Sequence, residues 1–172
     1  GLFYSATPTQ KFLWFGSSNL ATSTDGNRWN APNTGWPANL QVNSAAFGAS
    51  IYVLTGNSGN VATSTDGVTW TARVSASTSS MFTTTFGASK FASAGGLGAL
   101  QTSTNGIAWT SQTSGTTSTI GKIAFVNSLF IYAGQAMLAT STDAVTWTAR
   151  TLTTPATTTI TSVTFGASVY VY

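Results

Sequence analysis

Apolar and polar residues alternate along short stretches of this chain, and residues that favour turns separate the stretches. Four such stretches follow one another at residues 41–47, 51–54, 61–65 and 68–73. Alternation over roughly four to eight residues is typical of a strand with one buried face. No stretch of helical length carries an apolar stripe with the period of a helix. The pattern therefore predicts an all-β fold built from short antiparallel strands.

Two kinds of turn separate these stretches. The segment Phe47–Ser50 supplies the turn between the first two, and Asp66 with Gly67 supplies the turn between the last two. Two-residue hairpins favour Asp-Gly, because glycine accepts a positive φ and the aspartate side chain hydrogen-bonds locally. A later copy of this turn has Ala144 in place of the glycine, which predicts either a strained turn or a turn of another type.

The whole pattern repeats with a period of roughly 40 residues. A Thr-Ser-Thr-Asx segment recurs and ends each time in a tryptophan, at Trp29, Trp70, Trp109 and Trp147. A second marker of the type Phe-x-x-Ser keeps the same period and begins at Phe47, Phe86, Phe125 and Phe165. Four-stranded units at this period are typical of β-propeller blades, with a β-solenoid or an array of small sheets as the alternative. We therefore predict a single β-propeller domain over residues 1–172. Its repeats are at about 1–39, 40–79, 80–117 and 118–157, with a half repeat at 158–172.

The tryptophan-containing segments resemble the Asp-box, the bacterial neuraminidase repeat, which occurs in phage tail fibre and bacterial surface propellers. The usual box reads Ser-x-Asp-x-Gly-x-Thr-Trp, whereas the stretch Ser64–Trp70 has Asp and Gly side by side and is one residue shorter. The resemblance covers essentially the whole chain. It implies that the Asx caps a turn and that the Trp packs between sheets, in agreement with their chemistry. We expect structural roles, with the tryptophans in the core, for Asp25, Trp29, Asp66, Trp70, Asn105, Trp109, Asp143 and Trp147.

Charged residues make up only 5% of the chain, which has three acidic residues, all Asp, and neither His nor Cys. This inventory excludes a thiol nucleophile, a disulfide framework, a Cys/His zinc site and imidazole catalysis. The resemblance to sialidases implies an arginine cluster, a tyrosine nucleophile helped by Glu, and an Asp acid, yet this chain has no Glu. Glycosidases in general need two facing carboxylates, whereas each Asp here belongs to a separate repeat. We therefore expect no enzymatic activity, no cofactor and no metal.

The net charge of +3 comes from scattered cations, none of which are adjacent in the sequence. A chain without a basic stripe is not expected to bind nucleic acid, and no apolar run approaches the roughly 18 residues of a membrane span. One aromatic residue departs from the repeat, because Trp36 lies in a proline-flanked insertion of the first repeat. Its ring could stack on a sugar or seal the insertion onto the body, and packing is the commoner role. Trp36 is the one candidate for a ligand contact.

Serine and threonine dominate the segments that link the repeats, so the surface is polar with few charges. Such a surface tolerates close neighbours and changes in salt, which favours a virion or extracellular location. We therefore expect a non-enzymatic structural and receptor-binding propeller of a virion surface or tail fibre assembly. Its partners would be other subunits of that assembly and a host glycan. The alternative is a bacterial secreted or cell-surface propeller that binds protein or polysaccharide.

The half repeat would leave an unpaired strand edge, because a propeller ring pairs its first and last blades. The chain also begins at Gly1 without an initiating Met. We therefore expect the chain either to be an excerpt of a longer propeller or to have this edge covered by another subunit, with the excerpt favoured.

Overall fold

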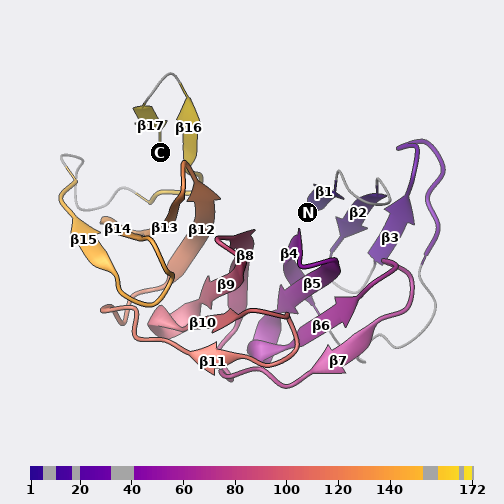
Figure 1. The fold of residues 1–172 in the computed structure, drawn as a ribbon, viewed down its shortest axis with the longest axis horizontal. Helices are drawn as coiled ribbons and strands as arrows, with labels where there is room; N and C mark the ends of the chain where they lie inside the picture. The colour runs from indigo at the N-terminus through magenta and orange to yellow at the C-terminus, as the bar shows by residue number, and fades with distance from the viewer. Residues whose placement is uncertain (6–10, 17–19, 32–40, 153–158, 167–168, 172) are drawn as a thin grey trace.

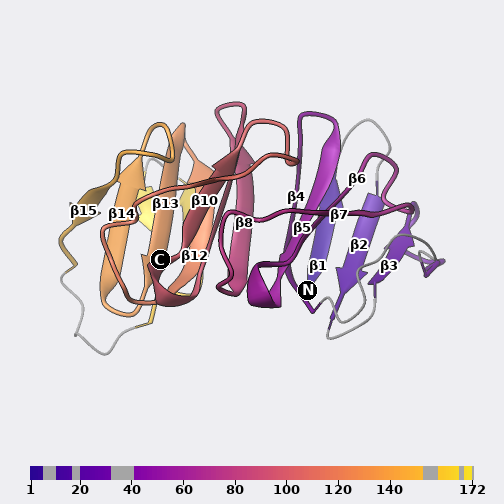
Figure 2. The same cartoon turned by 90° about the horizontal axis from the view of Figure 1, so that it is seen from below.

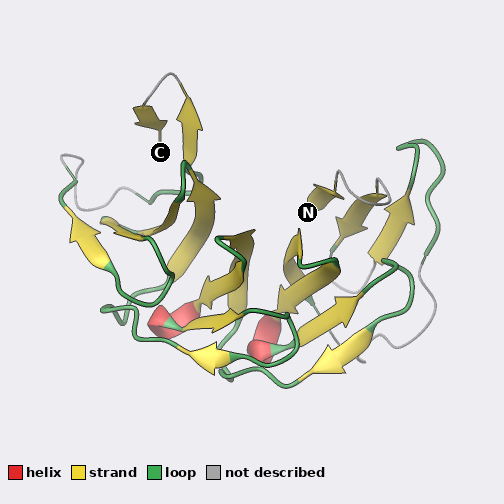
Figure 3. Cartoon of the chain, viewed as in Figure 1, coloured by secondary structure: helices red, strands yellow, loops and turns green. Residues whose placement is uncertain are grey.

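The structure is a computed structural model, which describes residues 1–5, 11–16, 20–31, 41–152, 159–166 and 169–171. Within these ranges, antiparallel strands form five sheets that follow one another in chain order. The helical elements there are two single 3₁₀ turns, η1 (Asn57–Gly59) and η2 (Gly96–Gly98) (Figure 3). None of the described helices is long and apolar enough to cross a membrane. The prediction of an all-β fold is confirmed.

Each sheet is a meander of neighbouring strands. The first sheet contains β1 (Leu2–Ser5), β2 (Lys11–Phe15) and β3 (Leu20–Ser23). The second contains β4 (Val42–Gly48), β5 (Ile51–Gly56), β6 (Val61–Ser64) and β7 (Thr71–Arg73). The third contains β8 (Met81–Gly87), β9 (Lys90–Gly95), β10 (Leu100–Ser103) and β11 (Thr110–Ser111). The fourth contains β12 (Ile120–Val126), β13 (Leu129–Gly134), β14 (Met137–Ser141) and β15 (Thr148–Arg150). The fifth is the hairpin β16 (Thr164–Gly166) and β17 (Val169–Val171).

The sheets stand side by side along an open arc (Figures 1 and 2). The first strand of each sheet lies on the inner side of the arc and the last strand on the outer side (Figure 1). The inner strands are neighbours, because β4 packs beside β8 and β8 packs beside β12. The open side of the arc lies between β1 at one end and the β16–β17 hairpin at the other (Figure 1). This is the arrangement of blades around a propeller axis.

The hydrophobic core lies between neighbouring sheets. Leu13 and Phe15 of the first sheet share one cluster with Tyr52 and Leu54 of the second. The opposite face of the second sheet packs through Val53 on the third sheet, and the third sheet packs on the fourth in the same way. A middle sheet therefore buries both of its faces, and for that reason β5 is buried along its whole length.

The first sheet departs from the prediction of four strands per full repeat. Its described part has three strands, and a fourth is represented by a single bridge between Thr22 and Asn30. The insertion that follows, which contains Trp36, lies outside the described residues.

Of the two predicted turns, the one within Phe47–Ser50 is present and the one at Asp66 differs from the prediction. The two-residue hairpin joins the first two strands of a sheet, where Ala49 and Ser50 both have positive φ (47° and 59°). Positive φ at both central positions is the mark of the type I′ hairpin turn. The prediction of a two-residue turn at Asp66 is wrong, because β6 ends at Ser64 and β7 begins only at Thr71. The aspartate side chain caps the intervening loop, as described below, and so lengthens it.

In the Phe-x-x-Ser marker, the residue after the phenylalanine is glycine at Gly48 and Gly87, and this glycine has a packing role. A Cβ atom built on Gly48 would overlap the ring of Phe86, and one built on Gly87 would overlap the ring of Phe125. Each of these rings belongs to the next sheet along the chain. At these two joints the marker therefore fits one sheet against the following one, with the aromatic ring of the later sheet seated on the glycine of the sheet before it.

Replacing Ser89 with glycine should stabilise the protein by about 0.5–1 kcal/mol, because Ser89 is exposed and its φ of 57° is unfavourable for an L-residue. The same change at Ser111, on an extended strand, should destabilise the protein by about 0.5–1 kcal/mol. Urea titration of both variants measures the difference. Equal effects at the two positions would contradict the turn assignment.

Candidate functional site

The residues singled out in the sequence form a repeated turn, which we call the Asx turn and illustrate with Asp66. One carboxylate oxygen of Asp66 accepts hydrogen bonds from the backbone N–H groups of Val68 and Thr69, both at 2.8 Å. The same oxygen accepts the hydroxyl of Ser64 at 2.8 Å, and this hydroxyl oxygen accepts the N–H of Gly67 at 2.7 Å. The side chains of Asp66 and Ser64 therefore accept hydrogen bonds from the backbone N–H groups of this turn. In a two-residue hairpin, the backbone carbonyls of the two strands would accept these hydrogen bonds instead.

The third repeat builds the same turn without a charge. Asn105 Oδ1 accepts hydrogen bonds from the N–H groups of Ile107 (2.9 Å) and Ala108 (3.0 Å) and from the Ser103 hydroxyl (3.1 Å). Asp25 and Asp143 make the same three contacts in their own turns. An amide serves here as well as a carboxylate, so the turn uses the oxygen as an acceptor and does not need its charge.

Hydrogen bonds to the carboxylates lower their pKa values. The pKa of Asp66 falls to about 2, chiefly because of the Val68 N–H, and that of Asp143 falls to about 2, chiefly because of the Thr146 N–H. The pKa of Asp25 is lowered by the Arg28 N–H in the same way. All three groups are therefore carboxylates near neutral pH, and Asp66 and Asp143 accept protons only in strong acid.

These pKa values set a pH dependence of stability. Below about pH 4 the unfolded chain binds protons that the folded chain still excludes, so the free energy of unfolding should fall as pH is lowered from about 4 to 2. The triple variant Asp25→Asn, Asp66→Asn, Asp143→Asn should lose most of this dependence, because Asn105 shows that the amide preserves the turn. Urea titrations across this range measure it. An unchanged acid dependence in the triple variant would contradict the assignment.

Two lysines join the Asx turns to the preceding sheet. The ammonium group of Lys11 donates to the backbone carbonyl of Asp66, and that of Lys90 donates to the carbonyl of Asp143 at 2.8 Å. Lys11 and Lys90 begin the second strand of their sheets, and Ile51 occupies the same position in the second sheet. Ile51 faces Gly106 of the next Asx turn. The turns of Asp66, Asn105 and Asp143 therefore dock on the sheet before their own, through a cation or through an apolar contact.

Ala144 adopts the conformation of the glycine that it replaces. Its φ is 59°, close to the 72° of Gly67 and the 73° of Gly106, and its side chain is fully buried. The fourth repeat therefore forms the same turn in a strained form, which is the first of the two alternatives predicted from the sequence.

The tryptophans that end the repeats differ in burial. Trp70 is 2% exposed and packs with residues of the first sheet, and Trp109 and Trp147 pack on the sheets that precede their own. Trp29 differs from the expectation of a core position, because 39% of its surface is exposed. The physical reason is its place in the first sheet, since no sheet of the described residues lies on the side that Trp29 faces.

The three aspartates do not come together. They follow β3, β6 and β14, which belong to three different sheets, and each carboxylate is engaged in its own Asx turn. In the part of the chain that the structure describes, no three acidic, His or Cys side chains lie close enough to hold a metal ion. The sites that these residues form are therefore local and repeated.

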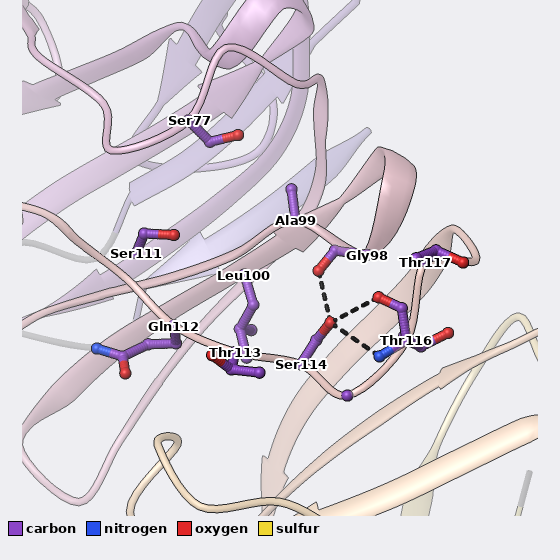
Figure 4. A pocket seen from close by; sticks show the side chains of 11 residues that line it. Ser77, Gly98, Ala99, Leu100, Ser111, Gln112, Thr113, Ser114, Thr116 and Thr117 are labelled. Carbon is purple, nitrogen blue, oxygen red and sulfur yellow. Dashed lines mark hydrogen bonds between the residues drawn. The ribbon is translucent and has the colours of Figure 1, made fainter.

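Sequence reasoning missed a cavity of about 700 Å³ at the outer side of the third sheet. It is lined by Ser77 from the linker after β7, by the end of η2 and the start of β10, and by residues 111–117 (Figure 4). None of the described residues that line it is charged or aromatic. The cavity presents hydroxyl groups, one side-chain amide, backbone groups and the apolar side chains of Ala99 and Leu100.

Internal hydrogen bonds hold this lining in place. The hydroxyl of Ser114 lies 2.7 Å from the carbonyl oxygen of Gly98 and 3.1 Å from that of Thr116 (Figure 4). The carbonyl of Ser114 accepts the Tyr132 hydroxyl at 2.6 Å, and burial raises the pKa of Tyr132. On the other side, Gln101 accepts the Ser75 hydroxyl at 2.8 Å and so anchors the linker that supplies Ser77. The walls are therefore fixed, while several hydroxyls face the cavity.

No family model matches the sequence, and neither does any curated protein. Solved structures match the fold. YCF48 from Cyanidioschyzon merolae is 16% identical with a TM-score of 0.65, and the match covers 89% of this chain and 56% of that one. Virginiamycin B lyase from Staphylococcus aureus is 11% identical with a TM-score of 0.72, covering 91% and 57%. An ancestral GH74 enzyme is 17% identical with a TM-score of 0.64, covering 84% and 23%. The fold is therefore that of a β-propeller, and the chain spans a little more than half the length of the first two neighbours.

Proposed function

We propose that this chain is a non-catalytic propeller of a virion surface or tail fibre assembly, which contacts a neutral glycan on the host. The observation that carries the glycan contact is the cavity beside β10 and β11, whose lining combines many hydroxyls with the apolar side chains of Ala99 and Leu100 and has no charged residue among its described members. The Asx turns then serve as the structural joints between blades.

The chemistry of the cavity suits a neutral, polyhydroxylated ligand. A sugar offers many hydroxyl groups, each of which both donates and accepts a hydrogen bond. Serine and threonine hydroxyls do the same, and the Gln112 amide adds donors and an acceptor. Its volume of about 700 Å³ is within the usual range of small-molecule sites, so one or two sugar rings could enter. Acidic or basic ligands would find no opposite charge in this lining.

The absence of catalysis is proposed from the state of the carboxylates. Glycoside hydrolysis requires a pair of carboxyl groups across one bond, one of them protonated near neutral pH. Here the aspartates belong to three separate sheets, and the pKa values of Asp66 and Asp143 lie near 2. Asn105 fills the same position without any acid function. These observations favour a binding role.

The proposed location follows from the sequence resemblance. The repeats resemble the Asp-box-like repeats of phage and bacterial surface propellers, and only 5% of the residues are charged. An uncharged surface suits dense packing beside other subunits, because it limits repulsion between like-charged neighbours. Trp36 stays a prediction for a second ligand contact, since it lies outside the described residues.

A glycan array probed with the labelled protein tests the glycan contact. We expect binding to neutral glycans, and at least about a tenfold loss of affinity in Ser111→Phe, because a phenyl ring there would fill the cavity. The control is Ala149→Phe, which makes the same addition at the corresponding exposed position of β15, away from the cavity. Absence of any neutral glycan among the ligands, or equal binding by Ser111→Phe, would overturn the proposal.

A further inference from the structure

A second pocket, of about 310 Å³, lies at the end of β10 and contains Lys90, and we call it the Lys90 pocket. Threonine and serine hydroxyls line much of it, including those of Thr102 and Ser103 in β10 and of Thr110 in β11. None of the described residues that line it is acidic or aromatic. The Lys90 pocket therefore has the hydroxyl-rich chemistry of the larger cavity, with one cation added.

The cavity and the Lys90 pocket adjoin on one side of the third sheet. Gln112 belongs to both linings and lies at one edge of the cavity (Figure 4). Leu100 of the cavity and Thr102 of the Lys90 pocket are two residues apart on β10, so their side chains share one face, about 7 Å apart along the strand. This face is turned toward the fourth sheet, because Leu100 packs on that sheet and Lys90 donates to the Asp143 carbonyl. The two hollows therefore follow one another along β10.

The side chain at the junction is neutral in this repeat alone among the second, third and fourth repeats. Gln112 Nε2 donates a hydrogen bond to Thr102 Oγ1 at 2.9 Å. The second and fourth sheets have an arginine at this position, whose Nε donates to the threonine of the same register: Arg73 to Thr63 at 2.7 Å, and Arg150 to Thr140 at 2.8 Å. The blade therefore accommodates either residue here, and the third sheet has the shorter, uncharged one where its two hollows meet.

The cation of the Lys90 pocket is balanced by a nearby carboxylate. The Lys90 ammonium group donates to the Asp143 carbonyl at 2.8 Å. Besides the Thr146 N–H and the other hydrogen bonds of this Asx turn, the charge of Lys90 also lowers the pKa of Asp143. An ammonium group has three N–H donors, so Lys90 can hold this carbonyl and still donate to a ligand hydroxyl. A donor with a balanced charge suits a neutral sugar better than it suits a free anion.

We propose that the glycan site extends past Gln112 into the Lys90 pocket, so that its ligand is a linear neutral oligosaccharide of at least trisaccharide length. This inference rests on the proposed function, in which one or two sugar rings occupy the cavity. The volume of the Lys90 pocket is near the lower end of the range for small-molecule sites and leaves room for about one further ring. A short sugar fills only the cavity, whereas a longer one also reaches Lys90 and the exposed hydroxyls of Thr104 and Thr110.

Isothermal titration calorimetry with neutral oligosaccharides of increasing length tests the proposal. The probes are the cello-, malto-, manno- and N-acetylchito-oligosaccharides, each from the disaccharide to the hexasaccharide. For the series that binds, we expect affinity to rise at least about tenfold from the disaccharide to the longer members. Lys90→Ile should remove most of this rise, and Ile51 at the same position of the second sheet shows that isoleucine fits there. Gln112→Arg, which introduces the residue of the neighbouring repeats, should also reduce the rise.

The matched control is Lys11→Ile. Lys11 makes the same contact with the next Asx turn, at the carbonyl of Asp66, but lines a pocket that shares no residue with the cavity. It should keep the full rise, and thermal melting establishes that all three variants are folded. Affinity that is independent of length, or a full rise in both Lys90→Ile and Gln112→Arg, would overturn the extension and leave the cavity as the whole site. Failure of every series to bind the unmodified chain would overturn the proposed function together with this inference.

Discussion

Replacing Gly87 with alanine is expected to lower the free energy of unfolding by about 3 kcal/mol or more, the upper end of the cost of overpacking. The added methyl group would overlap the ring of Phe125, which belongs to the next sheet. Neither partner can move easily, because Gly87 ends β8 beside a tight hairpin and Phe125 also packs on the ring of Phe130 at 4.7 Å. The two sheets would have to separate to admit one carbon atom.

Urea titration measures this loss, and Gly121→Ala is the matched control. Gly121 also lies in an inner strand, but a Cβ atom there would meet nothing within 4 Å. We expect a change within about 0.5 kcal/mol for the control, as for ordinary surface substitutions. If Gly87→Ala unfolded at the same urea concentration as the control, the ring of Phe125 would not be seated on this glycine.

Replacing Trp70 with alanine is expected to cost about 3–5 kcal/mol, as is usual for the removal of a large buried ring. Trp70 is 2% exposed between the first and second sheets, within 6.5 Å of the Tyr52 ring. The same substitution at Trp29, which is 39% exposed, should cost roughly a third as much, because part of the ring is already in water. Two copies of one repeat position are thereby compared within one protein.

Thermal and urea unfolding of both tryptophan variants provide the comparison. Losses of equal size would show that Trp29 has the packing of a middle blade. That result would contradict the assignment of Trp29 to an uncovered side of the first sheet.

The strands were predictable because each repeat carries its own signals. Alternation and the two markers predicted the sheets, and the first three strand starts of the second sheet agree closely, as for Ile51 and Val61. The last strand of the second sheet begins later than predicted, since the Asp66 side chain caps two further residues before β7. A dipeptide alone does not distinguish such an Asx turn from a two-residue hairpin.

Contacts between repeats were beyond sequence reasoning. Gly48 was interpreted as part of a turn, yet its essential neighbour is the ring of Phe86, which lies far along the chain. The exposure of Trp29 likewise depends on the neighbouring sheet, although its local sequence matches the other repeats. The repeat period and the strand propensities of the residues describe the strands of one blade. The glycine contact and the exposure of Trp29 depend on how two neighbouring blades pack together.

The cavity escaped prediction for a related reason. Its lining comes from three segments, represented by Ser77, Gly98 and residues 111–117, and combines hydroxyls, one amide, backbone groups and two apolar side chains without a motif. The one signal was the serine and threonine content of the linkers, which was interpreted only as a polar surface with few charges. Trp36, chosen because it breaks the repeat, stays a prediction outside the described residues.

The most direct test of the account is one saturation-transfer NMR experiment on the protein mixed with a neutral oligosaccharide selected from the array. The spectrum reports both binding and cleavage. We expect saturation to reach the sugar from the unmodified chain and from Ala149→Phe but not from Ser111→Phe, with the anomeric signals unchanged over time. Growth of new reducing-end signals, or transfer that Ser111→Phe leaves intact, would contradict a non-catalytic glycan site in this cavity.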